Sequence, residues 1–356
     1  MDSTRYGVRS TARARAAALL DRLWQASPPV TMVGALMLVV AGASLVGLVV
    51  DPRMITGAPA WLKPCKFAVS TAVYSLTLAW IFGWLSDWPR VRRVVGWTTA
   101  IVFVLEVAII DVQAWRGTTS HFNVSTPLDA TLFFVMGGAI LAQTLVSVAV
   151  AVALWRQRFT DRALGWALRL GMTLTIVGAM TGPLMTRPTP AQLAGARQGE
   201  QMTISGAHSV GGPDGGPGVP VTGWSREHGD LRVPHFIGLH AIQALALVAV
   251  GLRRWRRPEA VRVRALMAAA ASYASLFLLL LWQALGGQSV VAPDAAALAS
   301  IVIWAVLTTL GLGWIGLGSR HASRESPSVI HRSHRARASG PLGVDRSPVP
   351  HEARLR

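Results

Sequence analysis

The sequence predicts an all-α fold, a polytopic membrane helix bundle with eight transmembrane helices. Hydrophobic residues make up 52% of the 356 positions and charged residues only 14%, and the apolar residues come in runs longer than a soluble core needs. A helix needs about 20 apolar residues to cross the hydrocarbon layer. The stretches of suitable length are 29–50, 67–86, 94–110, 130–154, 163–185, 236–252, 265–285 and 295–318.

The segments around these spans differ from them in composition. Residues 1–28 are rich in Arg, and the first span is too long for the apolar part of a signal peptide, so we expect it to stay as an anchor. The third and sixth spans are the shortest, and each contains an ionisable residue, Glu106 or His240. Residues 319–356 have many Arg, Ser, His and Pro residues and few apolar ones, which predicts a disordered tail. The membrane domain therefore covers residues 29–318.

Basic residues predict the orientation. If alternate loops lie on opposite sides, one side has both termini and 26 Lys or Arg residues, and the other side has 8. Positively charged loops stay in the cytoplasm, so both termini are predicted to be cytoplasmic. This distribution explains the net charge of +17 without a nucleic-acid partner. The predicted partner is the lipid bilayer, and the abundant Ala and Arg favour the cytoplasmic (inner) membrane of a bacterium. The single cysteine, Cys65, excludes an intramolecular disulfide.

Two halves of the chain resemble each other at a nearly constant spacing. The matched residues are Leu62 and Leu231, Phe67 and Phe236, Pro89 and Pro258, and Gln113 and Gln283. Chance similarity among apolar helices is the alternative, but several of the matches lie in loops or at span ends. We therefore predict two parallel four-helix repeats, residues 29–156 and 163–320. Ligand sites tend to lie where such repeats meet.

The second half has a long outer loop, residues 186–234, where the first half has a short one. The loop contains a Gly-rich run at 211–218. It lacks the Gly-Lys-Ser/Thr ending of a phosphate-binding loop and the spaced acidic residues of a calcium loop. A flexible linker and an ordered lid over the outer mouth both fit this composition.

Polar residues in the predicted spans gather in the outer leaflet. Glu106 and Gln113 are two turns apart and share one face of the third span. Asp111 points about 140° away from Glu106 and is expected at the interface. An intramembrane carboxyl is costly, which favours a function for Glu106; the structural alternative is a packing role with Lys66 or His240 as its partner.

The sixth span contributes a second polar group. His240 and Gln243 are three residues apart and face one way. His235 points about 140° away from His240 in a regular helix, so the two are not expected to bind one metal ion together. Asp230 and Arg232 precede this span at the outer edge.

These residues make up the predicted site, although each has a packing or interfacial alternative. Glu106 and His240 are the predicted catalytic residues. A metal ion or haem b is a possible cofactor, with ligands among His121, His235, His240 and Glu106. The predicted ligand-binding residues are Lys66, Asp111, Gln113, Arg116, His121, Asp230, Arg232, His235 and Gln243.

Three segments resemble an uncharacterised family of bacterial multi-pass integral membrane proteins. They are residues 61–67 (Trp-Leu-Lys-Pro-Cys-Lys-Phe), 116–123 (Arg-Gly followed by Ser-His-Phe-Asn) and 229–240 (Gly-Asp-Leu-Arg followed by His-Phe and His). The resemblance covers the spans and excludes both tails. It implies a membrane location and no particular activity.

Three functions fit these observations. The first is a membrane-embedded enzyme or a metal or haem redox protein, with a His/carboxylate site open to the outer face. The second is a proton-coupled small-molecule transporter, favoured by the repeats and by Glu106. The third is an outer-face sensor or assembly partner. We rank the outward-facing site first, because the inner halves of the spans offer little of the polar path that transport requires.

Overall fold

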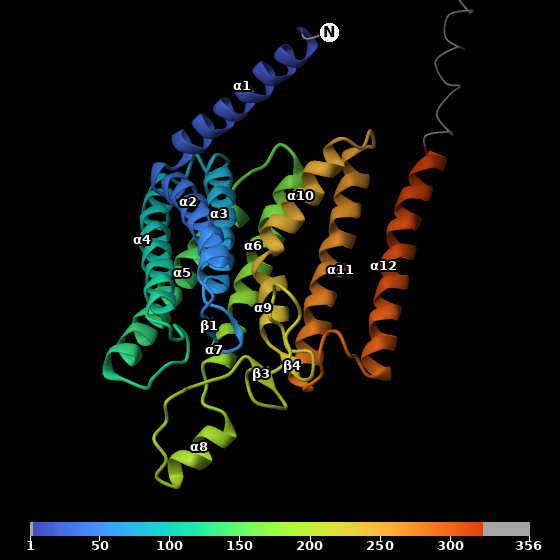
Figure 1. Ribbon diagram of the computed structural model, residues 1–356. Helices are drawn as coiled ribbons and strands as arrows, with labels where there is room; N and C mark the ends of the chain where they lie inside the picture. Colours follow the sequence, from blue (N-terminus) through green and yellow to red (C-terminus); the bar gives the residue numbers. More distant parts are fainter. Residues whose placement is uncertain (1–2, 323–356) are drawn as a thin grey trace, which may run out of the picture. The chain divides into compact units, whose positions relative to one another are not determined.

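The computed structural model describes residues 3–322, which are mostly helical with almost no sheet, and so confirms the all-α prediction (Figure 1). The predicted disordered tail lies outside the described residues from 323 onward. The long helices are α1 (Ser3–Ala26), α2 (Pro28–Val50), α3 (Leu62–Phe82), α4 (Pro89–Trp115), α5 (Pro127–Arg156), α6 (Arg162–Ala179), α11 (Glu259–Leu285) and α12 (Ala295–Ala322). The short elements are β1 (Met54–Ile55), β2 (Ala58–Pro59), α7 (Gly182–Met185), α8 (Pro190–Arg197), β3 (Ser209–Val210), β4 (Gly229–Asp230), α9 (Arg232–Leu239) and α10 (Ala241–Arg253).

Seven helices in the described part are long and apolar enough to cross a membrane. An eighth crossing is counted if α9 and α10, which are bent by 44° relative to each other, form one span. Each predicted span has a counterpart among these helices. Helices α4 and α11 are longer than the predicted spans 94–110 and 265–285, because hydropathy marks the apolar middle of a helix and not its polar ends.

The helices pack in two neighbouring groups (Figure 1). Helix α2 contacts α3 and α4, and α4 contacts α5; helix α6 contacts α9, α10 and α11. The contact between α5 and α6 joins the groups. The largest apolar core lies between α3, α5, α6 and α10, and its fully buried side chains include Leu78, Phe82, Leu154, Leu168 and Leu245.

The predicted sixth span is broken at His240, which ends α9 and precedes α10. Thr175 of α6 satisfies backbone groups that the break leaves free. Its Oγ1 accepts a hydrogen bond from Ile242 N at 3.1 Å and donates to Leu239 O at 3.3 Å. A broken helix is tolerated inside a membrane when a neighbouring helix supplies such partners.

Glycines let α6 approach this broken helix closely. A Cβ atom on Gly178 would lie 2.4 Å from Gly238 of α9, and one on Gly171 would lie 2.9 Å from the Ile242 Cα of α10. No real Cβ atom is found that close to backbone. Small residues at these positions therefore set the spacing of the two helices.

The α9–α10 pair reaches from one end of the bundle to the other. Arg232, the first residue of α9, donates to Gly223 O at 2.6 Å. Arg253, the last residue of α10, donates to Asp161, the residue before α6, at 2.8 Å. We call the end near Gly223 the loop end.

The long loop 186–234 is ordered at the loop end. Strands β3 and β4 pair antiparallel, with Ser209 opposite Asp230. The loop also contacts the connection between α4 and α5, where Asn123 forms a β-bridge with Ile204, and the connection after α11, where Ser289 Oγ donates to a loop carbonyl. The loop thus contacts two other connections of the bundle in this conformation.

Candidate functional site

Glu106 of α4 lies against Lys63 and His121, which come from other elements. Its Oε1 is 3.6 Å from His121 Nε2, and Lys63 Nζ is 2.9 Å from the other ring nitrogen, Nδ1. Glu106 is only 2% exposed, and its Oε2 has no hydrogen-bond partner among the described residues. The sequence predicted Lys66 or His240 as its partner instead. We call Glu106, His121 and Lys63 the Glu106 cluster.

The tautomer of His121 follows from the charge of Lys63. As an ammonium ion, Lys63 can only donate, so it then donates to Nδ1, and the ring proton lies on Nε2, toward Glu106. Burial, and next the positive charge of Lys63, lower the pKa of His121 well below its ordinary value of 6.5. His121 is therefore neutral near pH 7 and presents one N–H group to the carboxyl group.

The connection between α4 and α5 holds His121 in place. Phe122 has a positive φ of 63°, which is unusual for an aromatic residue and is a form of strain found at functional sites. The Asn123 side chain accepts hydrogen bonds from Ser125 N and Oγ. From the other side, Ser205 N of the long loop donates to Phe122 O at 2.8 Å. The strained residue beside His121 is thus held by two segments.

His208 of the long loop approaches the same place. Its ring lies 4.7 Å from the Phe122 ring, centroid to centroid, and its Nδ1 is 3.1 Å from Asp214. Burial lowers the pKa of His208 below 6.5, although Asp214 acts in the opposite direction. The site therefore contains two neutral histidines from two different loops.

Lys66, Asp230 and Arg232, all predicted to bind ligand, are brought together at the loop end. Asp230 is 1% exposed and forms an ion pair with Arg232 at 2.6 Å. Arg232 also donates to Gly223 O at 2.6 Å. Lys66 donates to the preceding carbonyl, Thr222 O, at 2.9 Å. Two of these three side chains, Lys66 and Arg232, thus hold the turn at residues 219–223.

Gln113 and Arg116, also predicted to bind ligand, instead hold the start of α5. Both donate to Asp129 Oδ1, at 2.9 Å and 2.6 Å respectively. Thr126 donates to Asp129 Oδ2 at 2.6 Å. These bonds satisfy the carboxylate and fasten the connection that carries His121. Asp111 belongs to neither group, and its Oδ1 has no hydrogen-bond partner among the described residues.

The two histidines of the sixth predicted span have different surroundings. His235 Nδ1 is 2.9 Å from Thr181 Oγ1, which links α9 to the residue before α7. His240 lies at the helix break, where its ring packs on Phe236 at a centroid distance of 4.4 Å, and Gln243 is its polar neighbour. Neither histidine belongs to the Glu106 cluster.

The described residues do not fit a metal site. No three His, Cys, Asp or Glu side chains among them come together in an arrangement that could hold a metal ion. Of the four predicted ligands, the structure brings together Glu106 and His121, and zinc sites in proteins use at least three.

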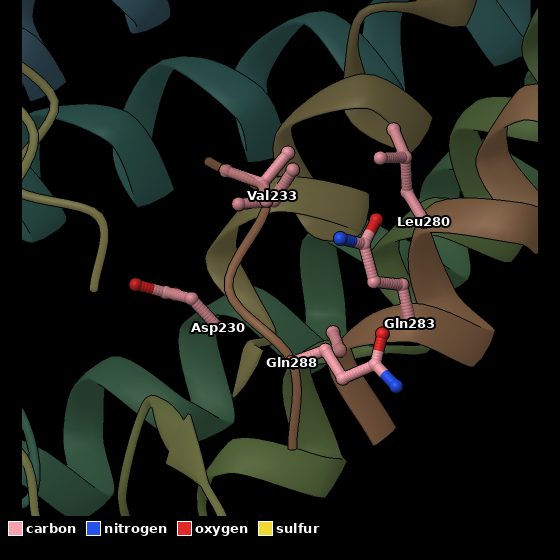
Figure 2. A pocket seen from close by; sticks show the side chains of 7 residues that line it. Asp230, Val233, Leu280, Gln283 and Gln288 are labelled. Carbon is pink, nitrogen blue, oxygen red and sulfur yellow. The ribbon is translucent and has the colours of Figure 1, made fainter. Parts of the chain in front are cut away.

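A hollow lies at the loop end of α11, beside β4 (Figure 2). It is lined by Asp230, Val233, Leu280, Gln283, Ala284, Gln288 and Val290. The Gln283 side chain projects between Val233 and Leu280, and its Nε2 donates to Ser289 O at 2.9 Å. The hollow is too tight to hold a water molecule, so it admits no ligand in this conformation.

The predicted site omitted Lys63 and His208. Lys63 offered a signal, because it is one of only two lysines in the chain and lies at the predicted start of a span, where the helix dipole disfavours a cation. His208 offered none, since its position beside Phe122 depends on the path of the long loop.

Comparisons with known proteins found no protein related to this chain. No family model, no curated protein and no solved structure matches this chain. The resemblance of residues 61–67, 116–123 and 229–240 to a bacterial membrane-protein family therefore stays a prediction. The chain is a helical protein of the integral-membrane type, and its chemistry has to be argued from the geometry above.

Proposed function

We propose that this protein is a membrane-embedded enzyme with an acid–base site open to the outer face. In this proposal Glu106 gives its proton to the substrate, the Nε2–H group of neutral His121 returns a proton to Glu106, and Lys63 replaces it at Nδ1 while it orients the His121 ring. The main support is the buried Glu106 carboxyl group. Its Oε1 lies 3.6 Å from His121 Nε2, and its Oε2 has no hydrogen-bond partner among the described residues. Contacts between catalytic groups are often this long in the free enzyme and shorten in the substrate complex.

In the same proposal the ordered long loop acts as the lid of the site. It contributes His208, which packs on Phe122, and the carbonyl groups that accept hydrogen bonds from Lys66 and Arg232. Closing a site with a lid excludes water and strengthens the electrostatic interactions inside it. A small molecule would enter from the outer face when this loop moves.

The proposed topology has eight spans, with both termini in the cytoplasm of a bacterial cell. The α9–α10 pair supports the eighth span, because Arg232 and Arg253 bind groups at opposite ends of the bundle. The excess of basic residues on the side of the termini supports the orientation. The loop end then faces outward.

Similar helix ends support the proposed duplication. In both α4 and α11, a glutamine side chain donates to the carbonyl group six residues later: Gln113 at 3.3 Å and Gln283 at 2.9 Å. Gly117 and Gly287, which end these turns, have nearly the same positive φ, 75° and 76°. Local backbone this similar at matched positions is expected of two copies of one repeat.

The acid–base proposal is tested by comparing native protein with two isosteric variants, Glu106→Gln and His121→Asn. Cells producing each form are examined by untargeted mass spectrometry of their membranes and medium. The native form should change the abundance of at least one small molecule, and each variant should slow that change about 100-fold or more. Asp111→Asn, a carboxyl-to-amide change on the same helix, is the matched control. A Glu106→Gln form as active as the native one would reject the proposal.

Proton-coupled transport is a second candidate function, and the broken α9–α10 helix favours it. Discontinuous helices line the substrate sites of many transporters, and His240 lies at the break. Proteoliposomes with an imposed pH gradient would distinguish the two functions. Uptake of a solute that is chemically unchanged afterwards would support transport, whereas conversion without uptake would support the enzyme.

A further inference from the structure

Three cations gather at the loop end where helix electrostatics disfavours them. Lys63 and Lys66 lie at the start of α3, and Arg232 is the first residue of α9. The positive end of a helix dipole repels cations and attracts anions. The three side chains are also close enough to repel one another. We call them the basic cluster.

The carboxylates nearby leave this cluster only partly neutralised. Asp230 is fully engaged by Arg232, which binds both of its oxygens, and Glu106 lies against His121 and Lys63. No carboxylate of the described chain lies within ion-pair distance of Lys66, whose hydrogen bond goes to the neutral carbonyl of Thr222. A further anion bound here would neutralise the remaining positive charge of the cluster.

The donors of Lys66 and Arg232 converge on one turn, while Lys63 contacts His121. Lys66 and Arg232 bind the carbonyl oxygens of two consecutive residues, Thr222 and Gly223. The Thr222 hydroxyl is buried and has no hydrogen-bond partner among the described residues. Two cationic side chains from two helices and one unpartnered hydroxyl thus come together at this turn.

The turn that Lys66 and Arg232 hold is strained. Val221 has a φ of 66°, a conformation that β-branched residues avoid. The turn is closed by Gly223 N donating to Val219 O at 2.8 Å. Strain of this kind persists where the surrounding structure requires a particular conformation, often at a ligand clamp.

We propose that Lys63, Lys66 and Arg232 bind a phosphate group that reaches them from the outer face, carried by a lipid headgroup or by a soluble compound. A carboxylate presents two oxygens in one plane, whereas a phosphate presents at least three acceptors in different directions. That arrangement matches donors from two helices and a turn. The inference rests on the proposed function, because it names the substrate class of the same site.

The test measures phosphate binding by the full-length protein in detergent. Isothermal titration uses two probes, inorganic phosphate and short-chain phosphatidylglycerol, at constant ionic strength. If the protein binds both probes, it recognises the phosphate group itself. If it binds only one, that result shows whether the phosphate is carried by a lipid or is soluble. Lys66→Gln should weaken binding about tenfold or more, and Lys66→Arg should retain it. Arg197→Gln, which removes an exposed cation of α8 in the same loop, is the matched control.

The outcomes separate this inference from the acid–base proposal. Glu106→Gln should bind phosphate at least as tightly as the native protein, because it removes a carboxylate from beside Lys63, even though its turnover is lost. If native protein binds neither probe, or if Lys66→Gln binds as tightly as the native form, the phosphate site is overturned, whatever the turnover assay shows. If Lys66→Gln cannot be purified in folded form, the native protein decides: binding of at least one probe supports the phosphate site, and binding of neither overturns it.

Discussion

His121 and His208 are residues whose protonation opposes folding. Burial lowers the pKa of both below 6.5, the ordinary value that an unfolded chain keeps. Below pH 6.5 the unfolded chain therefore binds more protons than the folded protein. The free energy of unfolding contributed by these residues is fully present above pH 6.5 and is lost as the pH falls toward their folded-state pKa values.

We therefore expect the purified protein to lose stability as the pH is lowered from about 7 to about 5. Each histidine contributes at most about 1.4 kcal/mol for each pH unit in that range. The measurement is the midpoint of thermal unfolding in detergent at a series of pH values. His121→Asn keeps an acceptor for Lys63 and removes the titrating ring, so its midpoint should depend less on pH. An unchanged pH dependence in this variant would contradict the burial of a neutral His121.

A residue of the site was predictable from sequence only where its position inside an apolar span made it unusual. Glu106 is an acidic residue in an apolar span, so sequence is enough to single it out. Its partners were not predictable, because Lys63 and His121 are distant in sequence and approach Glu106 only through the packing of α3 on α4 and the path of the connection after α4. The pairing of Gln113 and Arg116 with Asp129 was not predictable either, because it depends on how the connection between α4 and α5 folds back.

At the scale of elements, the break in the sixth span depends on a single side chain of a neighbouring helix. Thr175→Val keeps the shape of that side chain but removes both hydrogen bonds to the broken backbone at Leu239 and Ile242. The variant should lose about 1–3 kcal/mol of unfolding free energy, because it leaves a buried N–H group without a partner. Denaturant titration in mixed micelles measures this loss. Thr175→Ser keeps the hydroxyl and should unfold close to the native midpoint; equal losses in both variants would show that packing, and not the hydroxyl, matters here.

The long helices were predictable because each span has its own apolar signal in about 20 consecutive residues. The break at His240 was not, since hydropathy runs through it without interruption. Nothing within α9 or α10 alone reveals that Thr175 offers a substitute partner or that Gly178 and Gly238 let the helices meet. For the same reason the angle between His235 and His240 could not be taken from a regular helix.

At the scale of the whole molecule, the two ends of the bundle differ in the chemistry they offer. The loop end contains the Glu106 cluster, the basic cluster and the ordered loop. The opposite end contains structural contacts, such as Asp161 with Arg253 and Arg262 and Arg169 with the carbonyl groups at the end of α5. This asymmetry fits a site that serves one side of a membrane better than a path that connects both sides.

The number of crossings follows from where the two termini lie. If the α9–α10 pair crosses completely, as its contacts at both ends of the bundle indicate, the chain has eight spans and its termini lie on the same side. If the pair instead enters and returns, the chain has seven spans and its termini lie on opposite sides. We expect both termini in the cytoplasm, because the basic residues accumulate on that side. Fusing a fluorescent protein that folds only in the cytoplasm, and in parallel a phosphatase that is active only outside, to each terminus measures this directly. Fluorescence at both ends would support eight spans, and phosphatase activity at one end alone would establish seven.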